Sequence, residues 1–463
     1  MGPHLHATFA GSRFPLLFPT DPMSTTLGLE LQPDLPVCQS DLPLDWYQPE
    51  FKPYAEEYLA LPDRLPATVY AYLDRYMTPA LDHFGDSLLL LAHFYMGGEI
   101  VKLVERYGGA VADSYKLALK ARDMPEKKVI VESAVHFMAE SIALLARDDQ
   151  ETWITNPKAG CTMEMLAKDH MVLPVFDQLE ERFGDDLLVI SYMNTSGRIK
   201  ALAGRTGGAV CTSSNAHLVV EWARKKNKRI VFVPDQHLGR NTAAKLGMDL
   251  DKLHLLPDPQ RGAIHLDKKE LDAIADAEMI LWGSSCGVHT IFNEDMCAWW
   301  QARGWRVLVH PEAPLDAVLA ADGSGSTDFL WNAVLDAKPG DKLAIGTEGH
   351  FVQNARDLGR QHGVEVMHLA DLPADAVDSS GTPFRSIGCG CATMSRNDPP
   401  HLAGMLDLLR QGKGPDINRV LAGDSVDEIT MRRDRLDGAE REELIVHARA
   451  SLERMIAIVE AAK

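Results

Sequence analysis

The sequence predicts an α/β protein made of three related domains, with parallel sheets arranged around a pseudo-threefold axis. Three observations predict this fold class. From about residue 85 onward, short apolar runs with strand character alternate with helical patterns. One plan of strand, helix, glycine-containing turn and hydroxyl residues occurs three times, and a cysteine follows each copy. Strands interleaved with helices are typical of parallel sheets that are covered on both faces.

Length, charge and composition narrow the class of protein. A chain of 463 residues has room for about three domains of ~150 residues each. Its formal net charge of −19 makes nucleic acid and anionic lipid poor partners, since both bind basic surfaces. No apolar run approaches the ~20 residues of a membrane span, and we expect no secretory signal. Seven cysteines, an odd number, favour a reducing cytoplasm over a disulfide framework.

Residues 1–80 are expected to form a proline-rich, acidic, extended arm. They contain 12 of the 26 prolines, and ten acidic against four basic side chains. Because proline fixes φ and lacks an N–H donor, we expect no long helix and no central strand there. The arm could cover the body or a partner subunit, and Met23 is an alternative to Met1 as the natural start.

The three repeats follow the arm. We assign residues 81–170 to the first, 171–288 to the second and 289–395 to the third. Residues 396–463 are expected to form a helical tail that packs on the body, because Leu444, Ala448, Leu452 and Ile456 are spaced as on one helix face. The predicted strands are Leu88–Ala92, Leu187–Ser191, Ile230–Val233, Ile280–Trp282, Val307–Val309 and Lys342–Ile345.

Each repeat has an imidazole or phenol at the end of its first strand and a hydroxyl residue before a later helix. These residues are His93, Tyr192 and His310, followed after 21, 21 and 17 positions by Ser114, Ser213 and Thr327. Parallel sheets bind ligands at the carboxyl ends of their strands, so three such ends would form one central site. Hydroxyls at helix starts can be ordinary N-caps, but three in register favour an anionic substrate with several acidic groups.

Acid–base candidates lie beside these strand ends. His310-Pro311-Glu312 sets a carboxylate next to an imidazole, a pair suited to general acid–base chemistry near neutral pH. Tyr95 stands two residues beyond His93, so the two side chains could point the same way and the phenol could shuttle protons.

Cysteines follow the repeats in turn-like contexts, at Cys161, at Cys286 and at the pair Cys389 and Cys391. They lie too far apart along the chain for a zinc-finger or ferredoxin motif. One thiolate from each domain would meet on the axis and could hold a four-iron cluster whose remaining iron is an open Lewis acid. A three-cysteine zinc site and a redox pair of the last two cysteines are the alternatives. The other thiols are expected to be ordinary ones: Cys38, Cys211 and Cys297.

Several short segments, in order along the chain, resemble the quinolinate synthase (NadA) family. The match spans about residues 85–410 and includes Ala92–Tyr95, Asp113-Ser114, Phe137–Glu140, Tyr192–Ser196, Thr212–Ser214, Pro234–Arg240, His310–Glu312, Gly325–Thr327 and the three cysteines. The resemblance implies a central iron–sulfur cluster. It also implies an enzyme of NAD biosynthesis that condenses iminosuccinate with dihydroxyacetone phosphate and yields quinolinate, phosphate and water. An aspartate-oxidising enzyme would supply the iminosuccinate.

The same resemblance implies a role for each candidate residue. Cys161, Cys286 and Cys391 are the expected ligands of a [4Fe-4S] cluster with one iron open to substrate. Cys391 is preferred to Cys389 because Met394 stands three residues after it. Tyr95, His310 and Glu312 are the expected catalytic residues. The expected substrate-binding residues are His93, Ser114, Tyr192, Met193, Asn194, Ser213, His310, Pro311, Glu312 and Thr327.

Two other functions remain open from the sequence. One is a different iron–sulfur hydro-lyase that acts on a small hydroxy acid. The other is a non-catalytic metabolite-binding protein on the same scaffold. The chain contains Tyr95, His310 and Glu312 together with all three cysteines, which argues against the non-catalytic metabolite-binding protein.

Overall fold

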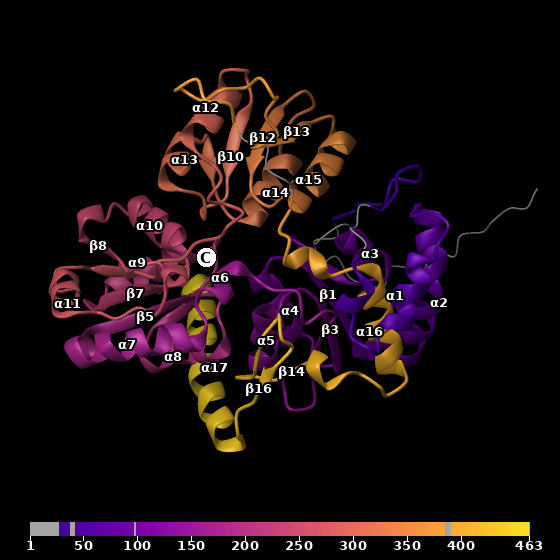
Figure 1. Ribbon diagram of the computed structural model, residues 1–463, viewed down its shortest axis with the longest axis horizontal. Helices are drawn as coiled ribbons and strands as arrows, with labels where there is room; N and C mark the ends of the chain where they lie inside the picture. Colours follow the sequence, from indigo (N-terminus) through magenta and orange to yellow (C-terminus); the bar gives the residue numbers. More distant parts are fainter. Residues whose placement is uncertain (1–26, 38–41, 97–98, 385–389, 463) are drawn as a thin grey trace, which may run out of the picture.

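Three α/β units, each built on its own sheet, surround a common centre in the computed structural model (Figure 1). The structure describes residues 27–37, 42–96, 99–384 and 390–462. In Figure 1 the third unit lies at the top, the second at the left and the first at the right, with helices on the faces of each sheet.

The three sheets share one strand order. In each unit the first strand lies between the second and third, and these neighbours pair in parallel. The first sheet contains β1 (Leu88–His93), β2 (Ala110–Ala112), β3 (Val129–Ser133) and β4 (Glu151–Ile154), and the antiparallel β14 (Arg419–Val420) joins it. The second contains β5 (Leu187–Tyr192), β6 (Ala209–Cys211), β7 (Arg229–Val233), β8 (Leu253–Leu255) and β9 (Met279–Leu281). The third contains β10 (Arg306–Val309), β11 (Gly323–Ser324), β12 (Lys342–Gly346) and β13 (Glu365–His368).

These strands confirm the predicted fold class and the six predicted strand segments. Every residue of β1 and β5 is buried, as expected for strands covered on both faces. The helices of the first unit are α3 (Ile100–Arg106), α4 (Ser114–Asp123), α5 (His136–Leu145) and α6 (Thr162–Met165). Those of the second are α7 (Asp169–Phe183), α8 (Gly197–Arg205), α9 (Ala216–Arg224), α10 (Gln236–Lys245) and α11 (Lys268–Ile274). Those of the third are α12 (Glu294–Gln301), α13 (Leu315–Ala320), α14 (Thr327–Leu335) and α15 (Gly349–His362).

The expectation of no long helix before residue 80 is wrong. Two helices form there, α1 (Lys52–Leu59) and the 19-residue α2 (Pro66–Phe84). Pro66 begins α2, where its missing N–H is not needed, and only Pro79 lies inside the helix. Val69, Tyr72, Leu73, Met77 and Ala80 form a buried stripe, and burial of this face outweighs the ~3 kcal/mol cost of one internal proline.

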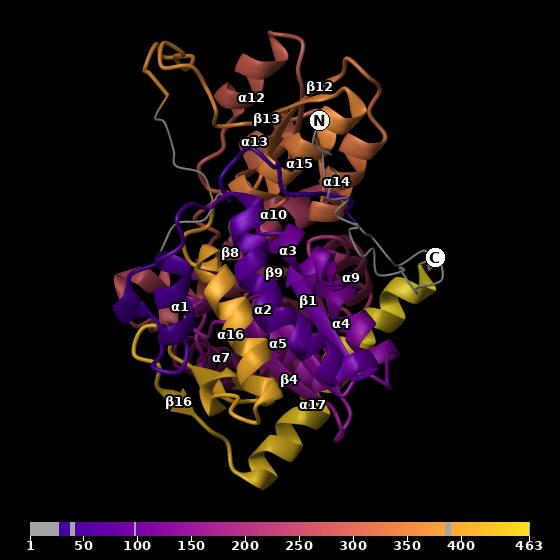
Figure 2. The same cartoon turned by 90° about the vertical axis from the view of Figure 1, so that its right-hand side faces the viewer.

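The tail ties the first two units together. Its helix α16 (Pro399–Arg410) lies beside α2 (Figure 2), and the Tyr54 hydroxyl donates to Asp407 Oδ2 over 2.7 Å. The tail then forms a short hairpin of β15 (Ser425–Val426) and β16 (Arg433–Asp434). The last helix, α17 (Gly438–Ala461), packs along α8 and also contacts α5. All four predicted contact residues of the tail are buried: Leu444, Ala448, Leu452 and Ile456.

A buried carboxylate reinforces the junction of the first two units. Glu140 of α5 accepts hydrogen bonds from the backbone N–H of Gly197, at the start of α8, and of Gly423 in the tail, over 2.6 and 2.8 Å. One turn further along α8, the Lys200 ammonium donates to the Thr195 carbonyl over 2.5 Å. The loop between β5 and α8 is therefore fixed from both sides.

Among the described residues, no helix is both long and apolar enough to cross a membrane.

We predict that Gly204→Ala destabilises the protein by about 1–3 kcal/mol, because a Cβ there would lie 1.8 Å from the His447 carbonyl oxygen and push α17 away from α8. Chemical denaturation measures the effect. Gly438→Ala is the matched control in α17: a Cβ at that position meets nothing within 4 Å, so stability should stay unchanged or rise slightly. Equal effects of the two substitutions would contradict this account of the α8–α17 contact.

Candidate active site

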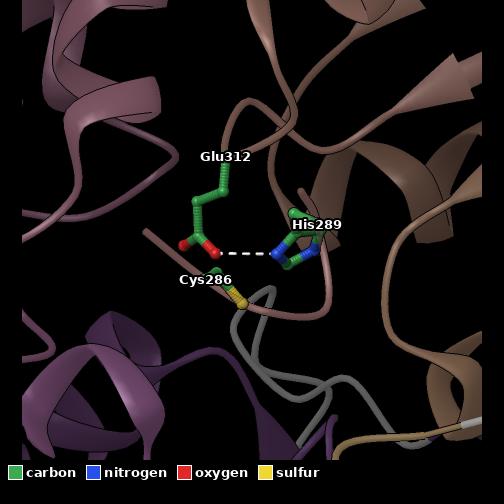
Figure 3. A group of neighbouring side chains, drawn as sticks. All are labelled: Cys286, His289 and Glu312. Atoms are coloured by element: carbon green, nitrogen blue, oxygen red, sulfur yellow. Dashed lines mark ion pairs between the residues drawn. The ribbon is translucent and has the colours of Figure 1, made fainter. Parts of the chain in front are cut away.

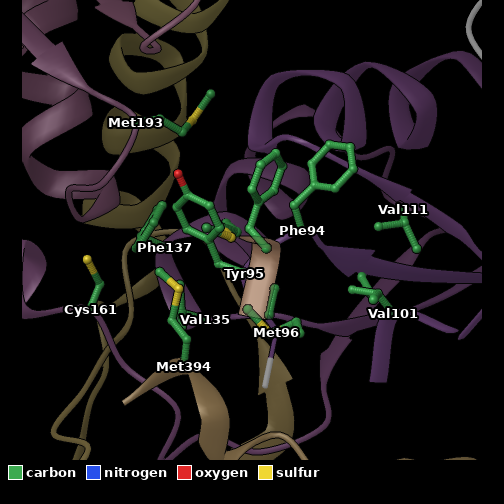
Figure 4. Close-up of a cluster of buried hydrophobic side chains, with 14 of the residues drawn as sticks. Phe94, Tyr95, Met96, Val101, Val111, Val135, Phe137, Cys161, Met193 and Met394 are labelled. Carbon is green, nitrogen blue, oxygen red and sulfur yellow. The ribbon is translucent and has the colours of Figure 1, made fainter. Parts of the chain in front are cut away.

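One cavity lies where the carboxyl ends of the three sheets meet, and all three units line it. Its lining residues are His93, Tyr95, Asp113, Ser114, Met138, Cys161, Thr162, Met163, Tyr192, Met193, Asn194, Thr212, Ser213, Cys286, Val288, His289, His310, Glu312, Thr327, Glu348, Cys391 and Met394. Tyr95, Met193 and Met394 also belong to the buried cluster that contains Phe94 and Phe137 (Figure 4). The cavity therefore sits directly on the hydrophobic core.

The structure brings together every predicted site residue except one. Pro311 is not part of the cavity wall; its carbonyl accepts a hydrogen bond from the Asn241 amide over 2.8 Å. Cys389 and Cys38 lie outside the described residues. Cys211 and Cys297 are buried free thiols that do not line the cavity.

His93 and His310 repeat the same local arrangement in the first and third units. The backbone N–H of Tyr95 donates to Nδ1 of His93 over 3.1 Å, and that of Glu312 donates to Nδ1 of His310 over 3.4 Å. Burial lowers the pKa of each imidazole to about 3, so both rings are neutral at pH 7. Since Nδ1 accepts, the proton of each ring is on Nε2. Both histidines are therefore hydrogen-bond donors for an oxygen-rich ligand.

Glu312 carries a buried negative charge. Its Oε2 lies 2.8 Å from Nδ1 of His289 (Figure 3). Its Oε1 accepts a hydrogen bond from the Tyr192 hydroxyl over 2.5 Å. Burial raises the pKa of the Glu312 carboxyl, but the close polar contacts with the His289 imidazole and the Tyr192 hydroxyl lower it by more, so the group stays ionised. Burial, and next the Glu312 charge, raise the pKa of the Tyr95 phenol far above its usual value. The site thus combines an ionised base with a protonated acid.

Helix N-termini from the first and third units open into the same cavity. Asp113 caps α4 by accepting from the Lys116 N–H over 2.9 Å, and Ser326 caps α14. The next residues, Ser114 and Thr327, line the cavity, as Asp113 also does. At each of these two helix starts one residue caps the helix and the following hydroxyl residue lies at the cavity, and a helix N-terminus favours a bound anion.

Three free thiols line the cavity, one from each predicted repeat: Cys161, Cys286 and Cys391. Their surroundings hold each in place. The Asn194 amide lies 3.8 Å from Cys161 Sγ, Asp235 Oδ2 accepts from the Cys286 N–H over 3.0 Å, and Glu348 Oε1 accepts from the Cys391 N–H over 2.8 Å. All three contacts fix the loops that carry the sulfur atoms.

The thiol environment fits a cationic metal centre. Burial raises the pKa of the Cys161 and Cys286 thiols well above the usual value, and each of these thiols is close enough to the other sulfur positions for their charges to interact. Three thiolates would therefore repel one another here without a cation, whereas a metal centre stabilises them. Donor atoms of Cys286, His289 and Glu312 also lie within 4.8 Å of one another, a second grouping able to hold a metal ion (Figure 3).

Sequence reasoning missed His289, Thr347 and Glu348. His289 stands three residues after Cys286, a spacing that is typical of ligand pairs, so the sequence offers a histidine close to this cysteine. Thr347 and Glu348 directly follow β12, as polar residues do at the ends of the other strands. The spacing of His289 from Cys286 and the polar residues after β12 are both visible in the sequence. They are not specific, because the chain has 17 histidines and many strands that end in polar residues.

Comparisons with known proteins are consistent with this geometry. The profile of the family described as "Quinolinate synthetase A protein" matches residues 81–457. A quinolinate synthase of Corynebacterium glutamicum is 35% identical over 412 residues, covering 88% of this chain and 93% of its own length. Quinolinate synthases of Streptomyces coelicolor and Bacillus velezensis are 37% and 35% identical, covering 78% and 73% of this chain and 87% and 85% of their own lengths.

We predict that the contribution of His136 to the free energy of unfolding of the metal-free protein falls as the pH is lowered from about 6.5 to 4. Burial, together with the nearby Lys168, lowers the pKa of His136 to about 4, so in this range the unfolded chain binds a proton that the folded chain does not. The slope contributed by this histidine approaches ~1.4 kcal/mol per pH unit, and His136→Gln should remove it. Denaturant unfolding at several pH values measures the slope. The exposed His170→Gln is the control; an unchanged slope in His136→Gln would contradict the account.

Proposed function

Because the chain belongs to the quinolinate synthetase A family, we propose that it is a quinolinate synthase of NAD biosynthesis that condenses iminosuccinate with dihydroxyacetone phosphate. The products are quinolinate, phosphate and water. The observation that carries the proposal is the cavity in which three thiols, two neutral histidines, a buried carboxylate and three hydroxyl residues converge from three units.

The cavity suits two anionic substrates. Their carboxylates and phosphate need hydrogen-bond donors that carry no fixed negative charge, and Nε2 of His93 and of His310 meets this need. The hydroxyls of Ser114, Ser213 and Thr327 supply further donors, and the helix starts of α4 and α14 add a favourable dipole. Tyr192, Met193 and Asn194 form part of the wall on the second unit, and Glu312 forms part of it on the third.

We propose that Cys161, Cys286 and Cys391 hold a [4Fe-4S] cluster. When bound, the cluster supplies a Lewis acid that assists the loss of hydroxide from a substrate carbon. Three protein thiolates leave one iron without a protein ligand, which accords with that chemistry. Free cysteines at these positions also agree with a reducing compartment, and we place the enzyme in the cytoplasm, supplied with iminosuccinate by an aspartate-oxidising partner.

The chain's own acid–base groups serve the proton transfers. The ionised Glu312 is the base that removes a proton next to the substrate carbonyl, and the protonated Tyr95 is the acid that donates to a substrate oxygen. His310 stays neutral and orients the substrate from Nε2. Units of residues 81–170, 171–288 and 289–395 each supply one cysteine in this scheme, with residues 1–80 and 396–463 outside them.

We predict that Cys286→Ala loses the cluster and all quinolinate formation, because one thiolate of three is removed. Iron and sulfide determination on protein purified without oxygen measures the loss. Cys297→Ala is the matched control, since Cys297 is also buried but lies in the core of the third unit. An active Cys286→Ala enzyme without iron would overturn the cluster assignment. A wild-type protein with intact cluster and no quinolinate product would favour another hydro-lyase instead.

We predict that Glu312→Gln keeps the cluster and the fold but lowers kcat by about 10²–10⁴-fold, because an amide cannot accept the substrate proton. Steady-state assays of quinolinate formation give kcat, and absorbance of the iron–sulfur protein reports the cluster. Full activity of this variant would show that Glu312 is not the base.

A further inference from the structure

An ion pair joins the first and third units at two helix starts that border the cavity. Nζ of Lys116, in the first turn of α4, lies 2.8 Å from Oδ2 of Asp328, in the first turn of α14. The cavity-lining Ser114 and Thr327 are the first residues of the same two helices. We propose that this ion pair is a clasp that holds Ser114 and Thr327 at the spacing required by the phosphate of dihydroxyacetone phosphate, an inference that rests on the proposed function.

A phosphate group is the part of the two substrates that needs such a spacing. Its three outer oxygen atoms can accept hydrogen bonds from two directions at once, and helix starts favour anions. Ser114 and Thr327 come from different units, so the distance between them depends on how these units are held together. A contact that crosses from α4 to α14 beside these residues therefore decides how well both hydroxyls reach one bound group.

The clasp acts together with an aromatic contact one turn further along α14. Trp331 packs on Phe94, the residue after β1, with ring centroids 5.8 Å apart, and both side chains are buried. This contact holds the body of α14 against the first unit, whereas the ion pair holds its first turn. Loss of the ion pair would therefore free the turn that carries Thr327 and leave the rest of α14 in place.

The Lys116 ammonium also compensates negative charge beside the cavity. Asp113 caps α4, lines the cavity and is 8% exposed. Burial, and next the charge of Asp328, raise the pKa of Asp113 to about 7, while Lys116 lowers it. Two carboxyl groups therefore lie close together at a place where the proposed function requires an anion to bind. Without the ammonium, their charge would oppose the phosphate.

Substitutions in the clasp are expected to change substrate binding rather than folding. The side chains of Lys116 and Asp328 are 31% and 19% exposed, so water screens part of their attraction. The first and third units are also joined by a more deeply buried ion pair, in which Nζ of Lys102 lies 2.7 Å from Oδ2 of Asp357. That pair and the Trp331 contact remain when Lys116 is replaced.

We expect Lys116→Met to raise KM for dihydroxyacetone phosphate about 10-fold and to leave kcat within about 3-fold of wild type. Binding is impaired in this variant, while the acid–base groups are untouched. Lys116→Arg keeps the charge and should bring KM close to the wild-type value. Lys128→Met is the matched control, since Lys128 pairs with Asp149 within the first unit, at the amino end of β3. Iron and sulfide content should be the same in all four proteins.

A charge exchange distinguishes the clasp from an effect of Lys116 on α4 alone. Lys116→Glu sets a carboxylate against Asp328 and should raise KM more than Lys116→Met does. Adding Asp328→Lys to Lys116→Glu restores an ion pair between the same helix starts, so KM should recover toward wild type. Asp328→Lys by itself should raise KM, because two ammonium groups then face each other. Simple attraction of the phosphate by added positive charge would lower it.

Calorimetric binding of dihydroxyacetone phosphate to the cluster-loaded protein gives a readout without turnover, and the dissociation constant should follow KM. The clasp is overturned if Lys116→Met binds this substrate as wild type does, if the charge exchange brings no recovery, or if Asp328→Lys alone lowers KM. If Lys116→Met does not fold, Asp328→Asn breaks the same pair from the other unit and is judged in the same way.

Failure of the proposed function is distinguishable from failure of the clasp. A wild-type protein that binds dihydroxyacetone phosphate yet forms no quinolinate contradicts the proposed function, and the dissociation constants of the variants still decide the clasp. A loaded wild-type protein that does not bind dihydroxyacetone phosphate overturns both.

Discussion

The buried negative charge of Glu312 is the constraint on which the centre of the molecule depends. An ionised carboxylate that is nearly inaccessible to solvent must find its compensation within the protein. The structure provides it for a carboxylate that follows β10 of the third sheet: His289 comes from the loop after β9 of the second sheet, and Tyr192 ends β5. Each residue that contacts the Glu312 carboxylate lies at the end of a parallel strand or in the loop that follows one. The charge and the convergence of the sheets are therefore two aspects of one arrangement.

Much of this arrangement could be predicted from the sequence, because its signals are local. Runs such as Leu88–Ala92 and Leu187–Ser191 are apolar throughout, and doubly covered strands require this. The three cysteines, one after each repeat, indicated a shared site, and the structure does bring Cys161, Cys286 and Cys391 to one cavity.

The remaining features depend on tertiary contacts that no local pattern contains. Helix α2 forms despite Pro79, because its apolar stripe has α16, more than 300 residues away, to pack against. His289 and Thr347 have no distinguishing local pattern, and they lie close together, with Nε2 3.0 Å from Oγ1, only because the loops after β9 and β12 meet in the fold. Pro311 was included through its neighbours, but its backbone turns away to bond with Asn241. Sequence therefore locates the strand ends, and long-range packing selects which side chains at those ends face inward.

The packing of α17 on α8, with its additional contact to α5, has a consequence for the order of folding. This helix occupies residues 438–461, yet it helps to hold the second unit against the first. Contacts between segments so far apart along the chain form more slowly than contacts between neighbouring segments. The joining of the first two units is therefore expected to be a late step of folding, after each sheet has formed from its own strands and helices.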